Sequence, residues 1–379
     1  MRRIGNYIHQ HKDWPSFHWD TEKLHASIGI VRNIQGRIVG KMEALGFLLR
    51  EEAALETLIL EVLKSTEIEG ETLNPDQVRS SIARRLGMDI AGLIPSDRHV
   101  DGMVEMAVDA TLHHTKALTE KRLFDWHAAL FPIGRSGMYK MEVVDWHKDE
   151  TGPMQVISGA MGKERVHFEA PDAKKLSKEM SAFIKWFNKE NNLDPVLKAA
   201  IAHFWFVTIH PFDDGNGRIA RAIADMQLAR ADDSTQRFYS MSAQIRLEQS
   251  KYYDILEKTQ KGDLDITEWL EWFLDCLRSA LNATGHTLAS VLTKAEFWKA
   301  HATTSLNERQ RKMVNKLLDE FDGKLTSSKW AKMTKCSADT ALRDIQDLVA
   351  KNVLKKELAG GRSTNYELIS NPAFFKSAQ

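Results

Sequence analysis

The residues with the clearest chemical potential lie in one stretch, "HPFDDGNGRIAR", from His210 to Arg221. A glycine-rich segment that opens a helix leaves backbone N–H groups unpaired, and Gly215 and Gly217 let that backbone approach a ligand closely. Such a helix start binds anions, of which phosphate is the commonest. Arg218 and Arg221 stand three residues apart on one helical face and add bidentate phosphate recognition. The stretch therefore predicts a phosphate-binding site.

Two more side chains of this stretch point to group transfer. Asp214 is a natural Mg²⁺ ligand, because Mg²⁺ usually takes one or two carboxylates together with phosphate oxygens. His210 is of the residue type whose pKa suits removal of a proton from an incoming hydroxyl. Each fragment alone is more often structural, since Gly-Asn-Gly is also a turn and His-Pro a helix end. The joint pattern suggests transfer of part of a nucleotide onto a hydroxyl group.

Helical periodicity dominates the elements that must position this stretch. The expected helices cover 21–64, 76–87, two helices within 98–130, 172–190, 194–209, the segment after 215, 250–264 and 265–283. Between 137 and 171 the helical period is lost, and "MQVISG" with "RVHF" reads as a hairpin. The tryptophans are expected mainly in the core, with Trp269 and Trp272 at helical spacing.

The segment from Leu306 onward has its own pattern. Three helices are expected in "NERQRKMVNKLLDEF", "TSSKWAKMTK" and "SADTALRDIQDLVAKNVL", the last with Ser337 as N-cap. Two strands joined through Gly360 and Gly361 follow. This order predicts a winged helix-turn-helix.

Composition bounds the class of protein. Lys and Arg total 52 and so do Asp and Glu, so a polyelectrolyte partner is not implied for the whole chain. From 305 to 379, 14 basic residues stand against 9 acidic ones, a weak hint of nucleic-acid contact. Cys276 and Cys336 lack metal-site spacing and favour a reducing compartment. Without a signal peptide pattern or a run of ~20 apolar residues, we expect a soluble cytoplasmic protein that does not enter membranes.

The twelve-residue stretch resembles the signature of the Fic family, His-Pro-Phe-x-Asp/Glu-Gly-Asn-Gly/Lys-Arg-x-x-Arg, without departure. Three other segments are similar to one bacterial branch of that family: "YIHQHKDWPSFHWD", the flap formed by "GPMQVISG" and "VHFEAP", and "YYDILEKTQKGD". The resemblance implies a mainly α fold with a small β-hairpin flap. We expect an N-terminal helical region at 1–90, a catalytic domain at 91–290 and a winged helix at 300–379.

The resemblance also implies an activity, adenylyl transfer from ATP to Ser, Thr or Tyr hydroxyls of proteins, this chain included. By motif position His210 would be the base and Asp214 the Mg²⁺ ligand. The residues expected to bind the nucleotide are Gly215, Asn216, Gly217, Arg218, Ile219, Ala220, Arg221, Tyr253 and Gln260. The first three would cradle the phosphates, and the two arginines would hold the β and γ phosphates. A homodimer is also implied.

Several of these assignments have alternatives or limits. Tyr253 and Gln260 lie where similar proteins contact adenine, but core packing is as plausible for Tyr253. Gly217 favours AMP transfer, because the Doc branch, which phosphorylates its target, has Lys there. His203 and His167 lack i,i+4 partners for a metal and are expected to be structural. The flap would hold the target by strand addition through Val156, Ile157, Ser158 and Gly159.

The segment "STEIEG", 65–70, ends a long amphipathic helix. Ser65 and Glu69 are four residues apart and share a face, and Gly70 fits an ordinary helix C-terminus. Beside the Fic signature, however, the segment resembles the inhibitory motif Ser/Thr-x-x-x-Glu-Gly/Asn. The resemblance implies that Glu69 pairs with Arg221 and displaces the γ-phosphate. Glu67 and Glu71 are expected on other faces of this helix end.

Two other functions compete with AMP transfer. The same site could remove AMP from a modified hydroxyl, with the glutamate orienting water. The C-terminal segment could instead make the chain a DNA-binding regulator. Its candidate phosphate contacts are Arg343, Lys351, Lys355, Lys356 and Arg362. Against this, Asp339, Asp344 and Asp347 on the expected recognition helix would repel DNA.

Overall fold

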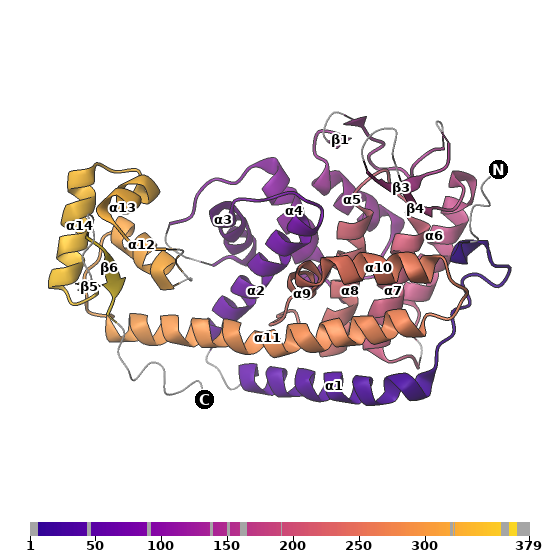
Figure 1. Ribbon diagram of the computed structural model, residues 1–379, viewed down its shortest axis with the longest axis horizontal. Coiled ribbons are helices and arrows are strands. Elements are labelled where there is room, and N and C mark those ends of the chain that lie inside the picture. Colours follow the sequence, from indigo (N-terminus) through magenta and orange to yellow (C-terminus); the bar gives the residue numbers. More distant parts are fainter. Residues whose placement is uncertain are drawn as a thin grey trace. The chain divides into compact units, whose positions relative to one another are not determined.

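A computed structural model describes residues 7–43, 47–88, 92–136, 139–149, 152–159, 165–190, 192–318, 321, 323–357 and 364–369. The described chain is mainly helical, with small two-stranded antiparallel sheets (Figure 1). It divides into two compact units, one of Met1–Gly87 with Ile94–Thr284 and one of Met88–Leu93 with Gly285–Gln379. The division into domains at 1–90, 91–290 and 300–379 stays a prediction.

The first unit contains the signature stretch and most of the helices. These are η1 (Ile8–Gln10), α1 (Thr21–Glu43), α2 (Phe47–Ile68), α3 (Pro75–Leu86), α4 (Arg98–Leu112), α5 (Glu120–Leu130), α6 (Ala173–Asn188), α7 (Pro195–Ile209), α8 (Asn216–Asp232), α9 (Met241–Leu247), α10 (Gln249–Gln260) and the start of α11 (Thr267–Ala300). The predicted helices are confirmed, although 21–64 is two helices and α11 runs beyond 283. The short helix α9 was not predicted.

Helix α7 is the centre of this unit's core. Asp194 caps it by accepting hydrogen bonds from the N–H groups of Val196 and Leu197, and Pro195 occupies the first turn. Every residue from Val196 to Ile209 is buried, so the helix is covered by the protein on all sides. Helix α8 packs along it (Figure 1). The turn between these two helices is therefore anchored at both ends by the core.

The flap is the expected hairpin. Strand β3 (Gln155–Ser158) pairs antiparallel with β4 (Arg165–Glu169), with a register shift between Val156 and Ile157. A shorter pair, β1 (Arg135–Ser136) with β2 (Tyr139–Lys140), was not predicted, because two residues carry no detectable period. Among the helices in the described ranges, none has the length and apolar character needed to cross a bilayer.

The second unit has the predicted order of three helices and two strands. After the end of α11 come α12 (Glu308–Leu318), α13 (Ser327–Thr334), α14 (Ala338–Ala350), β5 (Leu354–Lys356) and β6 (Tyr366–Leu368). Trp330, Met313 and Ile345 are fully buried in its core. Ser337 caps α14 by accepting from the N–H of Thr340, as predicted. The Gly360–Gly361 turn and Arg362 lie outside the described residues.

Candidate active site

His210 ends α7 in the left-handed conformation, with φ 53° and ψ 55°. Its Nδ1 lies 3.3 Å from the carbonyl oxygen of Val207, an arrangement that favours the proton on Nδ1 and leaves Nε2 as a free acceptor. Burial lowers the pKa of His210 to about 4, so the ring is neutral at neutral pH. A neutral imidazole with a free Nε2 is ready to accept a proton.

The turn after His210 is held by internal bonds. The Asn216 side chain donates to the Phe212 carbonyl (2.7 Å) and accepts from the Phe212 N–H (3.0 Å). Gly215 adopts φ +84°, and a Cβ there would lie 2.9 Å from Cε2 of Phe131. Glycine is thus required at 215 both for conformation and for space. Asn216 shapes the turn that presents the start of α8.

The two neighbouring carboxylates, Asp213 and Asp214, have different hydrogen-bond partners. Oδ2 of Asp214 accepts from the Ser136 hydroxyl (2.6 Å), and its Oδ1 from the Gly215 N–H (2.5 Å). Asp213 accepts from the backbone N–H of Glu142 (3.2 Å). The Asp214 side chain is 41% exposed beside the start of α8. An accessible carboxylate next to the predicted phosphate site fits Mg²⁺, which keeps several waters and takes the rest of its ligands from phosphate.

Arg221 is buried and bonded to the segment 65–70. Its Nε donates to Ser65 Oγ (2.9 Å), and its Nη2 donates to the Ser65 carbonyl (2.9 Å) and to Oε1 of Glu69 (2.7 Å). Its Nη1 is buried and has no hydrogen-bond partner within the described part of the chain. The predicted contact between Glu69 and Arg221 is present, and one donor of the guanidinium stays available.

Gly217 makes room for this contact. A Cβ at 217 would lie 2.5 Å from Oε1 of Glu69 and 3.2 Å from Nη1 of Arg221. Gly70, with φ +81°, turns the chain away directly after Glu69. Gly217 thus leaves space for the Glu69 carboxylate, and Gly70 lets the chain turn directly after Glu69.

Arg218 faces a second acidic group that the sequence did not predict. Its Nη1 lies 3.4 Å from Oε2 of Glu71, which also lies 3.0 Å from Nε2 of His99. The expectation that Glu71 sits on another helical face is wrong, because α2 ends at Ile68 and the chain then turns. Glu67 does lie elsewhere, paired with Lys64 at 2.8 Å.

Comparison with known proteins agrees with this geometry. Residues 117–228 match the Fic/DOC family, and residues 7–88 match a domain of unknown function, DUF4172. The chain carries a Fic domain. The protein adenylyltransferase Fic of Culex quinquefasciatus is 30% identical over 235 residues, covering 61% of this chain and 42% of that protein. That of Drosophila erecta is 26% identical over 268 residues, covering 67% and 49%. The chain spans about half the length of these curated relatives.

A solved structure shares the fold. A Fic family protein from Desulfovibrio desulfuricans G20 matches with a TM-score of 0.53 at 21% identity, covering 93% of this chain and 98% of that one. This likeness concerns the fold alone. It agrees with the mainly helical architecture and with the small hairpin flap seen here.

The remaining nucleotide-binding candidates differ in accessibility. Ile219 and Ala220 are fully buried, so their side chains pack in the core. Gln260 is also buried and donates to the Thr208 hydroxyl (3.2 Å). Tyr253 is 43% exposed, with its hydroxyl 3.5 Å from the Ile68 carbonyl. The expected alternative of core packing therefore does not hold for Tyr253, and its neighbour Tyr252 fills the core instead.

The flap presents apolar side chains to solvent. Val156 is 37% and Ile157 55% exposed, while Ser158 is bonded to His167.

His203 is buried, 3.0 Å from the Tyr252 hydroxyl, and burial lowers its pKa to about 3. Among the described residues, no three His, Cys, Asp or Glu side chains are grouped to hold a metal ion.

Two histidines near the Fic motif had no sequence signal. His127 is buried and stacks on Phe212 with ring centroids 4.1 Å apart. His147 is buried, and its backbone N–H donates to the Pro211 carbonyl (3.0 Å). Both come from segments far from the motif in sequence, so only the fold brings them there. They shape the turn that contains His210.

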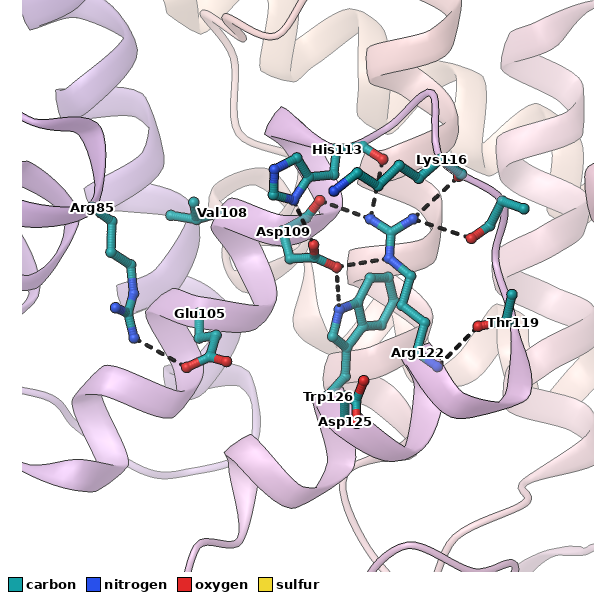
Figure 2. A pocket seen from close by; sticks show the side chains of 11 residues that line it. Arg85, Glu105, Val108, Asp109, His113, Lys116, Thr119, Arg122, Asp125 and Trp126 are labelled. Carbon is teal, nitrogen blue, oxygen red and sulfur yellow. Dashed lines mark hydrogen bonds and ion pairs between the residues drawn. The ribbon is translucent and has the colours of Figure 1, made fainter.

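A separate charged cavity of about 620 Å³ lies between α4 and α5 of the first unit. Figure 2 shows the Arg122 guanidinium and the Trp126 ring both directed at Asp109, at 2.7 and 2.8 Å. Arg122 also donates to carbonyls at the end of α4, including that of His113 (3.2 Å). No motif residue lines this cavity. These bonds fix the α4–α5 turn, and this cavity is not our candidate active site.

Proposed function

We propose that this chain is a protein adenylyltransferase that transfers AMP from ATP to Ser, Thr or Tyr hydroxyls of proteins, itself included. The observation that carries the proposal is the neutral His210, bonded through Nδ1 to the Val207 carbonyl and placed at the start of the turn that leads into α8 and its two arginines. The matched relatives are named as protein adenylyltransferases, which supports the same activity.

The site residues divide the work between binding and proton transfer. The N–H groups at the start of α8 and the guanidinium of Arg221 bind the phosphates, and Nη1 of Arg221, which has no hydrogen-bond partner among the described residues, is available for this contact. His210 accepts the proton of the incoming hydroxyl as the oxygen attacks the α-phosphate and pyrophosphate leaves. Asp214 would hold Mg²⁺, which when bound neutralises charge on the phosphate oxygens. Positioning and charge neutralisation thus account for most of the catalysis.

Self-inhibition is part of the proposal. Glu69 occupies Nη2 of Arg221, the group proposed to hold the γ-phosphate. Carboxylate and phosphate compete for the same donors, so ATP binds in its productive geometry only when Glu69 gives way. Ser65 and Gly70 position this carboxylate, Ser65 by bonding the same arginine.

The direct test is incubation of the protein with ATP labelled at the α-phosphate, with and without a cell lysate. We expect label on protein from wild type, more from Glu69→Gly and none from His210→Ala. Parallel reactions with other labelled nucleotides report the base preference. Absence of protein-bound label from Glu69→Gly with every nucleotide would reject the proposal.

The same site supports a second candidate activity, removal of AMP from a modified hydroxyl. The supporting observation is that the Glu69 carboxylate stands at Gly217, next to the proposed phosphate site, where it could orient water. Wild-type protein mixed with AMP-modified chain would then release free AMP, and Glu69→Gly would not. Stable modification in both mixtures would exclude this activity.

A third candidate function, DNA binding by the second unit, is favoured because two acidic residues of α14 are paired with basic residues. Asp344 was expected to repel DNA, yet it is buried and accepts from Nε of Arg309 (2.8 Å). Asp347 is paired with Lys351 at 2.5 Å. The exposed residues of α14 are then Ala338, Asp339, Leu342, Arg343, Gln346 and Ala350, and the paired Asp347 side chain is 45% exposed. A salt-dependent shift of duplex DNA by the full chain, weakened in Arg343→Glu, would support binding; no shift at low salt would exclude it.

The cellular compartment and the oligomeric state are also part of the proposal. Cys276 and Cys336 are both free thiols, which fits the reducing cytoplasm where ATP is abundant. A homodimer stays a prediction, to be tested by the mass of the protein in solution.

A further inference from the structure

Three polar side chains from three segments form one chain of hydrogen bonds beside the flap. Ser158 Oγ on β3 lies 2.5 Å from Nε2 of His167 on β4. Nδ1 of the same ring lies 2.6 Å from Oε2 of Glu257 on α10. Neither His167 nor Glu257 has a place in the mechanism above.

Glu257 is the fixed end of this chain. Its Oε1 also accepts from Arg165 (2.9 Å) and Lys261 (2.5 Å). Although burial raises it, hydrogen bonds from Lys261, His167 and Arg165 lower the pKa of Glu257 to about 2. The carboxylate is therefore ionised, and the tautomer of His167 that fits this contact carries its proton on Nδ1. Nε2 is then the acceptor for the Ser158 hydroxyl.

A bulge in the hairpin directs His167 toward α10. Val156 pairs with Phe168 and Ile157 with Val166, so His167 has no partner on β3. An extra residue of this kind changes the direction in which side chains leave a strand. The His167 ring can thus reach Ser158 on one side and Glu257 on the other.

We propose that Ser158, His167 and Glu257 form a latch that fixes the flap to α10 and so positions the strand that docks the protein acceptor. The inference rests on the proposed function for its role in catalysis. The Ser158 hydroxyl is engaged in the latch, which leaves target contacts to the β3 backbone and to the exposed Val156 and Ile157. Glu257 stands one turn after Tyr253, so the latch ties the docking strand to the proposed adenine side.

The order Ser–His–carboxylate is also that of a hydrolase triad, with the same ring nitrogens in the same roles. A triad works in a water-excluded site with donors for a developing oxyanion. Ser158 lies instead on an exposed strand, where water weakens such electrostatic effects. The latch is the role that its exposed position favours.

The test uses the full chain with Glu69→Gly, to which His167→Phe or Glu257→Ala is added. Asp254→Ala, an exposed carboxylate on the same helix, is the matched control. Hydrogen exchange at the amides of β3 and β4 should rise about tenfold in the two latch variants and stay unchanged in the control and at α8. Glu257→Gln, which can still accept from Nδ1, should restore most of the protection.

Transfer kinetics give the second measurement, with the full-length His210→Ala chain as acceptor. The KM for this acceptor should rise about tenfold in both latch variants, while the KM for ATP stays unchanged. The double variant should be no worse than Glu257→Ala alone, because Glu257→Ala already removes the contacts of Glu257 with both His167 and Arg165.

Three results separate the possibilities. Unchanged exchange at β3 and β4 in both variants overturns the latch. A covalent adduct of a fluorophosphonate with Ser158 would overturn it in favour of a nucleophilic serine. If Glu69→Gly transfers no AMP, the proposed function fails, and hydrogen exchange still decides whether the latch exists.

Discussion

Nη2 of Arg221 donates to Oε1 of Glu69 across 2.7 Å, although the two residues are 152 positions apart in the chain. The carboxylate comes from the turn after α2, and the guanidinium from the first turns of α8. Ser65 holds the same guanidinium through its hydroxyl and its carbonyl. Two residues of the segment 65–70 thus hold the arginine that we propose to bind phosphate.

Replacing Glu69 by glycine should raise self-modification by about 10- to 100-fold. A charge-assisted pair of this kind contributes ~1.5–3 kcal/mol, and ~1.4 kcal/mol corresponds to a tenfold change in binding. Label incorporated per minute from ATP is the measurement. Glu67→Gln is the matched control and should behave as wild type. Equal rates for wild type and Glu69→Gly on every acceptor would remove the inhibitory role of Glu69.

Glu71→Gln should activate as well, but only by about two- to fivefold. The Glu71–Arg218 contact is longer, 3.4 Å, and the Glu71 side chain is 44% exposed, which limits such a pair to ~0.2–1 kcal/mol. The apparent KM for ATP should fall by the same factor. An effect as large as that of Glu69→Gly would show that Arg218, rather than Arg221, is the main point of inhibition.

His210→Ala should reduce AMP transfer ~10²–10⁴-fold, the usual effect of losing a positioned base, while ATP binding stays close to wild type. Binding depends on the α8 amides and arginines, which the substitution does not touch. Calorimetric titration with ATP and labelling rates, both in the Glu69→Gly background, measure the two effects. Labelling at the Glu69→Gly rate by the double variant would exclude His210 as the base.

The pH profile should show that His210 is neutral over an unusually wide range. Its pKa is lowered to about 4 by burial, and the base acts in its neutral form. On the acidic side of the profile, kcat/KM of the Glu69→Gly protein should therefore stay constant from about pH 8 down to about pH 5 and fall as the pH approaches 4. An inflection near pH 6.5 that disappears in His210→Gln would contradict the buried environment of this ring.

Asp214→Ala should mimic removal of divalent cations. Chelation and the substitution should each abolish transfer, and together they should do no more than either alone. Asp213→Ala is the matched control, since Asp213 accepts from the Glu142 N–H, whereas Asp214 accepts from the Ser136 hydroxyl. A dead Asp213→Ala with an active Asp214→Ala would reverse the assignment.

Local sequence patterns predicted most of the elements, and the family resemblance predicted the Glu69–Arg221 contact, while the other contacts between distant segments needed the fold. The capping of α14 by Ser337 and of α7 by Asp194 depends on neighbours in sequence. The Glu71–Arg218 contact was missed because it depends on where α2 ends, and helix ends are the least certain feature of a periodic pattern. The stacking of His127 on Phe212 had no sequence signal, since the two are brought together only by tertiary packing.

Because Gly217 has no side chain, the Glu69 carboxylate can lie against it, and the proposed inhibition depends on this space. A methyl group there would meet the end of a flexible Glu69 side chain, which can swing away at little cost to folding. We therefore expect Gly217→Ala to fold and to lose the proposed inhibition by Glu69, although the substituted residue lies on α8 and not in the segment 65–70. A lysine at this position, as in the Doc branch, would leave no space for the Glu69 carboxylate. The proposed inhibition by Glu69 therefore depends on a glycine at 217, and we expect a side chain at 217 to be incompatible with it.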